Sequence, residues 1–189
     1  MIFVNSMSDL FHVDIPEDFV RQIFQVMLNV DRHIYQVLTK RPARALRFFE
    51  RNRSLFPSGK IPAHIWIGTS VENQEVVSRV RHLRAVPAEV RFLSCEPLLG
   101  EVSLDLDDIH WVIVGGESGS GYRPMEEAWV LAVKTQCEDT NTAFFFKQWG
   151  GRTPKARGRL LQERTWDEMP LGALTERVKY QGLSAPRST

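Results

Sequence analysis

The sequence predicts an α/β fold in which parallel strands alternate with helices. Six short runs rich in β-branched and aromatic residues start 21 to 32 residues apart, and most of these steps fit a βα unit. Most runs are continuously apolar, which is typical of strands buried on both faces of a sheet. The expected strands are Ile2–Asn5, Ile34–Thr39, Ile65–Thr69, Val90–Ser94, Trp111–Val114 and Ala143–Lys147.

Helix signals lie between most of these strands. Asp14 can cap a first helix, Pro16 suits its first turn, and an apolar stripe continues to Met27. Later helices are expected to start near Pro42, Asn73 and Pro124. Between the fourth and fifth strands, Leu98-Leu99-Gly100 and Asp105–Asp108 leave little room for a full helix, so this crossover is expected to be shortened.

Repeated βα units with right-handed crossovers form either an open doubly wound sheet or a barrel of the TIM type. Six strands are too few for a closed eight-stranded barrel. The sequence pattern does not separate these two architectures, and a partial TIM-type barrel of about six strands over residues 1–150 is the specific form of the barrel alternative. Residues 150–189 hold eight Lys or Arg and only four Asp or Glu, so residues 151–189 are expected to form a basic, partly extended tail.

Composition excludes several classes of protein. The net charge of +1 provides no overall field for nucleic acid or a membrane. No apolar run approaches the roughly 20 residues of a membrane span, and the first residues have no basic leader. Only Cys95 and Cys137 are present, which suits free thiols in a reducing compartment, and two cysteines cannot ligate an iron–sulfur cluster unaided. The expected location is the cytoplasm, with no membrane contact.

Polar residues follow the expected strands, where ligands bind in either parallel architecture. Any one of them could simply cap a helix, but together they predict a small-molecule pocket at this mouth. The candidate catalytic residues are Lys40, Glu96, Glu117 and Lys147.

Two motifs at the mouth have alternative interpretations. Glu96 and Glu117 could form a glycosidase-like carboxylate pair, or they could be paired structurally with Lys40, Arg41 or Lys147. The glycine-rich segment 115–121 could cradle a phosphate or an amino-acid moiety with its backbone N–H groups. Its spacing matches neither G-x-G-x-x-G nor a P-loop, which disfavours nucleotide binding by those mechanisms.

No metal site is expected, because the sequence lacks metal-binding His or Cys spacing and most histidines precede strands. A basic stripe formed by Arg44, Arg47 and Arg51 could contact nucleic-acid phosphates. The alternative for this stripe is an ordinary solvated helix face.

Six ordered motifs and a closing motif resemble those of the bacteriophage gp-thirty-seven/gp-sixty-eight protein family, over residues 2 to about 170. That family is functionally uncharacterised and is similar in pattern to radical S-adenosylmethionine enzymes. The motifs are Phe3-Val4-Asn5-Ser6-Met7-Ser8-Asp9, Gln36-Val37-Leu38-Thr39-Lys40-Arg41-Pro42, Gly68-Thr69-Ser70-Val71-Glu72-Asn73, Arg91-Phe92-Leu93-Ser94-Cys95-Glu96-Pro97, Val114-Gly115-Gly116-Glu117-Ser118-Gly119, Phe146-Lys147-Gln148-Trp149-Gly150 and Arg164-Thr165-Trp166-Asp167-Glu168-Met169-Pro170.

The resemblance implies a partial (β/α) barrel with an iron–sulfur cluster on a three-cysteine loop. In the family this loop lies upstream of the motif that is Asn5–Asp9 here, so the first βα unit and the cluster ligands are expected to be missing from this chain. The S-adenosylmethionine side of the site would remain, and the cluster is expected only in full-length relatives. The implied cofactor-binding residues are Asn5, Ser70, Glu72, Asn73, Gly115, Gly116 and Glu117.

The leading hypothesis is a phage-type protein that resembles the C-terminal part of a radical S-adenosylmethionine enzyme and is inactive in cluster chemistry as this chain stands. One alternative is a non-enzymatic module that binds nucleic acid or protein. Another is a cluster-independent hydrolase that uses Glu96 and Glu117. The edge of the first strand is also expected to make the chain self-associate.

Overall fold

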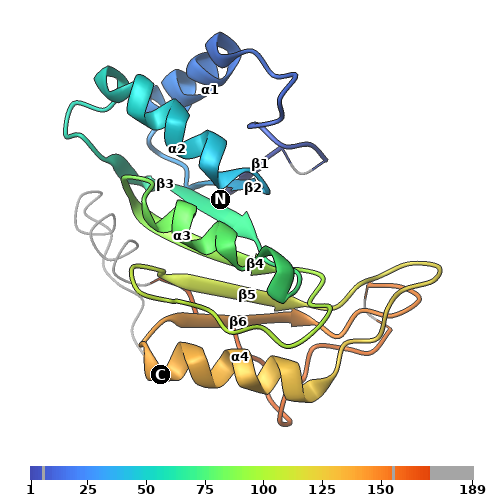
Figure 1. Cartoon of the computed structure of the whole chain (residues 1–189). Coiled ribbons are helices and arrows are strands. Elements are labelled where there is room, and N and C mark those ends of the chain that lie inside the picture. Colours follow the sequence, from blue (N-terminus) through green and yellow to red (C-terminus); the bar gives the residue numbers. More distant parts are fainter. Residues whose placement is uncertain (6, 155, 171–189) are drawn as a thin grey trace.

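The computed structural model describes residues 1–5, 7–154 and 156–170. Six strands form one sheet in the order of the sequence, and every neighbouring pair is parallel. The strands are β1 (Ile2–Val4), β2 (Tyr35–Thr39), β3 (Ile61–Ser70), β4 (Ala88–Cys95), β5 (Trp111–Gly115) and β6 (Ala143–Gln148). A doubly wound sheet would reverse its strand order at one point, whereas this sheet curls continuously into a half-barrel (Figure 1). The predicted partial barrel is confirmed.

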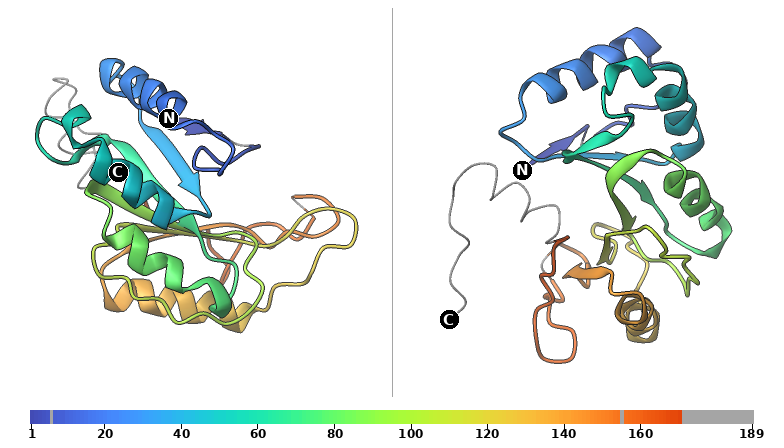
Figure 2. Two further views of the ribbon diagram at one scale, coloured as in Figure 1. Left: turned by 45° about the horizontal axis from the view of Figure 1, so that its top comes forward. Right: turned by 90° about the vertical axis from the view of Figure 1, so that its left-hand side faces the viewer.

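Four α-helices lie along the outer side of the curled sheet (Figure 2). They are α1 (Glu17–Asn29), α2 (Pro42–Arg51), α3 (Ser78–Arg84) and α4 (Glu127–Asp139). The third helix starts later than expected, because the Asn73 side chain caps a short 3-10 turn, Gln74–Val76, instead of α3 itself. No helix forms between β4 and β5, which confirms the shortened crossover predicted from the sequence.

The two faces of the sheet bury different sets of side chains. On the outer face, strand residues such as Val37 and Phe146 belong to one large apolar cluster with helix residues such as Phe24. On the concave face, Trp66 and Trp111 form a separate apolar cluster with their ring centroids 5.7 Å apart. Because both faces are covered, the strands are continuously apolar rather than alternating.

Residues 164–168 return antiparallel along the outer edge of β6. The backbone N–H of Phe146 donates to the Trp166 carbonyl at 2.9 Å, and the Trp111 indole N–H donates to the Glu168 carbonyl at 2.8 Å. Trp166 is buried. The first part of the expected basic tail therefore packs on the sheet, and its remainder, residues 171–189, lies outside the described residues.

The opposite edge of the sheet is β1. Within the described part of the chain β1 pairs with β2 alone, and Ile2 and Phe3 remain 40% and 43% exposed. Self-association through this edge stays a prediction. Among the described residues, no helix combines the length and the apolar character that crossing a membrane requires.

Gly68 allows the concave face to pack closely, and this provides a test of the fold. A Cβ atom at Gly68 would lie 2.4 Å from Cζ of Phe92, which is itself fully buried on the neighbouring strand. We expect Gly68→Ala to lower the free energy of unfolding by about 1–3 kcal/mol in urea titrations, because the Phe92 ring must shift within a packed core.

The matched control is Gly100→Ala, where a Cβ atom would meet no heavy atom within 4 Å. Its free energy of unfolding should stay within about 0.5 kcal/mol of wild type. Equal stabilities of the two variants would contradict the close packing of Phe92 on Gly68.

Candidate functional site

The carboxyl ends of the strands form a rim of polar side chains above the aromatic concave face. Ser70 of β3 pairs in register with Ser94 of β4, two residues beyond the Gly68–Phe92 pair. Both serines are buried. Glu72 and Glu96 each lie two residues further along, just beyond the last residues of β3 and β4. The rim therefore has hydroxyls below and carboxylates above.

Glu72 holds Lys40 at the mouth. One carboxylate oxygen of Glu72 forms an ion pair with Lys40 Nζ, and the other accepts from Arg79 Nη1 at 2.8 Å. Arg79 also donates to the Ser70 carbonyl at 2.9 Å, which fixes its position. Burial raises the pKa of Glu72, but the two cations outweigh burial and hold its pKa below the ordinary value. Glu72 is thus a partly buried anion with an exposed lysine above it.

Glu96 reaches across one strand to Lys147. Its Oε1 lies 2.8 Å from Lys147 Nζ, although β5 separates the strands that carry these two residues. The Glu96 side chain extends over Gly115 of β5, where a Cβ atom would lie 2.8 Å from Glu96 Oε1. The Ser94 hydroxyl donates to the other oxygen of Glu96 at 3.1 Å. Of the alternatives left open by the sequence, the structure shows Glu96 paired with Lys147.

Glu117 is engaged within its own loop. It accepts hydrogen bonds from Arg123 Nε at 2.9 Å, from Arg123 Nη2 at 2.7 Å and from the Arg123 backbone N–H at 2.8 Å. These bonds lower the pKa of Glu117 to about 2. A glycosidase proton donor needs a raised pKa. This arrangement therefore counts against Glu117 as a general acid opposite Glu96.

The glycine-rich segment after β5 serves the packing of two loops. The Gly116 N–H donates to the Gln148 carbonyl at 2.9 Å, and the Gly119 N–H donates to the Gly151 carbonyl at 3.0 Å. A Cβ atom at Gly116 would lie 2.0 Å from the Trp149 carbonyl oxygen. Two of the N–H groups considered as a phosphate cradle are thus already used inside the protein.

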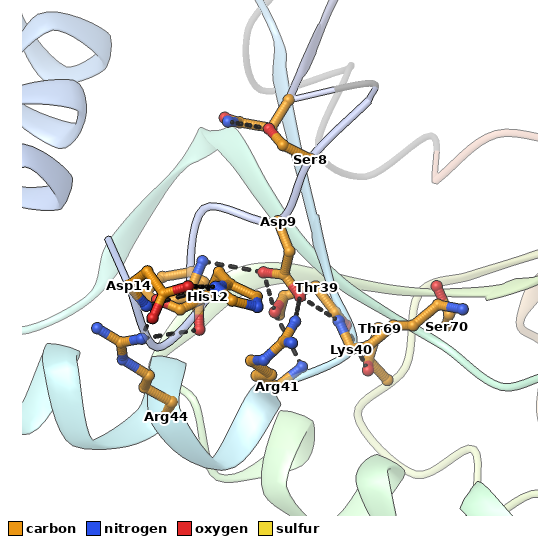
Figure 3. Close-up of polar contacts among 12 residues, drawn as sticks. Ser8, Asp9, His12, Asp14, Thr39, Lys40, Arg41, Arg44, Thr69 and Ser70 are labelled. Atoms are coloured by element: carbon orange, nitrogen blue, oxygen red, sulfur yellow. Dashed lines mark hydrogen bonds and ion pairs between the residues drawn. The ribbon is translucent and has the colours of Figure 1, made fainter. Parts of the chain in front are cut away.

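Asp9 joins the loop after β1 to the end of β2 (Figure 3). One oxygen accepts from the Thr39 hydroxyl at 2.7 Å, and the other accepts from Arg41 Nη1 at 2.8 Å and from the Lys40 N–H at 3.1 Å. The Phe11 N–H also donates to Asp9, at 2.9 Å. Asp9 belongs to the first sequence motif, but three of its partners, Thr39, Lys40 and Arg41, lie about 30 positions away, so the sequence alone does not predict this role.

The remaining candidates have local partners. The Asn5 amide donates to the Ser8 hydroxyl at 2.9 Å, and the Asn73 side chain accepts from the Glu75 N–H at 3.1 Å. Neither contact belongs to the charged pairs of the rim.

The basic stripe on α2 is mostly used within the fold. Arg44 Nη2 donates to the Ile15 carbonyl at 2.8 Å, and Arg44 Nη1 donates to the His12 carbonyl. Arg51 pairs with Glu17 at 3.3 Å, while Arg47 is exposed. Arg44 therefore anchors the segment before α1.

Neither cysteine suits a metal or a reactive thiol. Cys95 and Cys137 are buried, and burial raises the pKa of both thiols, to about 12 for Cys137. Among the described residues, no group of three or more His, Cys, Asp or Glu is placed to hold a metal ion.

Asp9 generates a stability prediction. Burial raises its pKa, but the hydrogen bonds from Thr39, Phe11, Lys40 and Arg41 outweigh burial, so the pKa lies below its ordinary 3.8. Ionised Asp9 therefore stabilises the fold above pH 3.8, and this stabilisation is lost as the pH falls through the lowered pKa.

At pH 7 we expect Asp9→Asn to lower the free energy of unfolding by about 2–3 kcal/mol, measured by urea titration. The difference from wild type should shrink at pH 3. Asp18→Asn, which changes a residue with an 89% exposed side chain, is the matched control and should have little effect at either pH. A constant difference at both pH values would contradict the role of the ionised carboxylate.

Comparison with known proteins identifies one family. No curated protein and no solved structure matches the chain significantly. A family model described as "Protein of unknown function (DUF5131)" matches residues 1–170, which includes every strand of the half-barrel and every residue of the rim. The chain therefore belongs to the DUF5131 family of proteins of unknown function.

Proposed function

We propose that the half-barrel binds S-adenosylmethionine at the carboxyl mouth of its strands, as the cofactor-binding part of a phage-associated protein of the radical S-adenosylmethionine type. One observation carries the proposal. Two carboxylate–lysine pairs, Glu72 with Lys40 and Glu96 with Lys147, stand at one rim above a row of serine hydroxyls. The motif resemblance to that enzyme class gives independent support.

The chemistry of the rim suits this cofactor. S-adenosylmethionine carries a carboxylate, an ammonium group and ribose hydroxyls. The exposed ammonium groups of Lys40 and Lys147 can meet the carboxylate, while Glu72 and Glu96 can accept from the ammonium group and the ribose. Below this level the concave face is filled by buried aromatic rings such as Phe92. A ligand would therefore bind across the rim and not inside the half-barrel.

The chain's own residues also orient this site. Arg79 fixes Glu72 through its bond to the Ser70 carbonyl, and Ser94 fixes Glu96. Groups held in place before binding lose less freedom when the ligand arrives.

The described residues do not fit an iron–sulfur cluster. Its ligands would be thiolates, and the two cysteines are buried, with raised pKa values. Reductive cleavage of the cofactor is therefore not assigned to these residues, and their proposed role is to bind and orient it.

Neither nucleic-acid binding by the basic stripe of α2 nor hydrolysis by a Glu96–Glu117 pair gains support from contacts of the described residues. Arg44 is committed to backbone carbonyls, which leaves Arg47 and the paired Arg51 on that stripe. Glu117, needed for a hydrolase pair, is bound by Arg123.

Calorimetric titration with S-adenosylmethionine tests the proposal. We expect saturable binding by the full chain, and we expect Glu72→Gln and Glu96→Gln each to weaken it about 10- to 100-fold, since each removes a charge-assisted contact. S-adenosylhomocysteine serves as a second probe that keeps the amino-acid and ribose groups.

The matched control is Glu89→Gln, an exposed position at the opposite end of the strand that leads to Glu96. It should bind like wild type. Thermal melting of each variant separates a binding defect from a folding defect. Absence of saturable heat with the wild-type chain, or equal affinities for all three variants, would overturn the proposal.

A further inference from the structure

The segment after β6 carries a concentration of positive charge that the chain as a whole lacks. We call residues 149–164 the basic loop. It contains five Lys or Arg and one acid, whereas the complete chain has a net charge of only +1. The basic residues are Arg152, Lys155, Arg157, Arg159 and Arg164, and the acid is Glu163.

The described residues of the basic loop, 149–154 and 156–164, are folded and lie beside the mouth. The Trp149 N–H donates to the Gly158 carbonyl at 3.0 Å, and its indole N–H donates to the Leu160 carbonyl at 2.8 Å. Gly151 forms a parallel bridge with Ser118 of the loop after β5. Figures 1 and 2 show these two loops running together beyond the carboxyl ends of the strands. The basic loop therefore projects from the rim that carries Lys147.

Most of the described arginines of the basic loop have no carboxylate partner among the described residues. Arg159 pairs with Asp167. Arg152, Arg157 and Arg164 are exposed, and no carboxylate in the described part of the chain forms an ion pair with them. At the mouth, in contrast, both lysines are paired with glutamates. Three arginines with no ion pair in the described chain are thus close together in sequence on one projecting loop.

Aromatic rings lie among these arginines. The Arg164 guanidinium lies 3.7 Å from the centroid of the Trp166 ring, and that of Arg159 lies 5.4 Å from the Phe145 ring. Phe145 and Trp149 are only partly buried. A combination of arginines and accessible rings suits a ligand with both phosphates and flat bases.

We propose that the basic loop binds single-stranded nucleic acid and presents a nucleotide to the mouth, which makes nucleic acid the substrate class of the proposed site. The presentation step rests on the proposed function, whereas the binding step does not. A single strand is favoured over a duplex because a base must leave its stack to reach the rim.

Fluorescence anisotropy with labelled oligo-dT and oligo-U of about 20 nucleotides tests the binding step. We expect both strands to bind with an affinity that falls between about 50 and 200 mM salt. The double variant Arg152→Gln/Arg157→Gln should weaken binding about tenfold and reduce the slope of log K against log salt by ~1.4, because two phosphate contacts are lost. Arg152→Lys/Arg157→Lys keeps both charges and should retain most of the affinity.

The matched control is Arg47→Gln/Arg51→Gln on α2, which removes the same charge from a different element. It should leave the affinity unchanged. An equal loss in this control would show that the binding is not specific to the basic loop. The wild-type chain should also bind single strands more tightly than a duplex, poly-glutamate or anionic phosphatidylserine vesicles. Equal affinity for any of these would overturn the proposal.

Titration of the basic-loop variant with S-adenosylmethionine distinguishes cofactor binding at the rim from nucleic-acid binding by the basic loop. The basic-loop variant should bind S-adenosylmethionine like wild type, since neither Arg152 nor Arg157 forms an ion pair with the carboxylates of the rim. Cofactor binding without oligonucleotide binding would overturn this inference alone. Oligonucleotide binding without cofactor binding would overturn the proposed function and the presentation step, and would leave a nucleic-acid-binding loop.

Discussion

The parallel direction of the six strands is the constraint on which the rest of the molecule depends. Because each strand pairs in parallel with its neighbours in sequence order, every carboxyl end lies at one rim. Side chains that are far apart in the sequence, such as Lys40 and Glu72, then become neighbours. An antiparallel sheet of the same strands would distribute these residues between two rims. The concentration of charge at the mouth follows directly from the strand direction.

Two glycines on the concave side leave room for a side chain from the neighbouring strand to extend over them. Gly68 leaves room for the Phe92 ring, which closes the aromatic layer below the mouth. Gly115 leaves room for the Glu96 carboxylate, which can then meet Lys147 across β5. The absence of a side chain therefore permits close packing at Gly68 and an ion pair across β5 at Gly115.

Charge is organised differently inside and outside the mouth. At the rim, partly buried carboxylates are paired with cations, as partial burial of a charge requires. On the basic loop, solvent stabilises the exposed Arg152, Arg157 and Arg164, and only Arg159 forms an ion pair within the described chain, with Asp167. Paired groups suit a small zwitterionic ligand, which can exchange contacts with both members of a pair. Unpaired cations suit a polyanion, whose binding releases counterions.

Local patterns determined the number, type and approximate positions of the strands and helices, because hydrophobic period and capping residues act within a few positions of the chain. Strand ends could likewise be named as the candidate site from the sequence. The partners of those residues could not be named. Asp9 with Arg41, and Glu96 with Lys147, are joined only when the sheet curls and its register is set.

The choice between an open sheet and a half-barrel also needed the tertiary structure, since both contain the same βα units. The sequence by itself determined which residues reach the rim, through the direction of the chain in each βα unit. Only the tertiary structure decided which of them touch, because contact between Glu96 and Lys147 depends on strand order, register and the open space above Gly115.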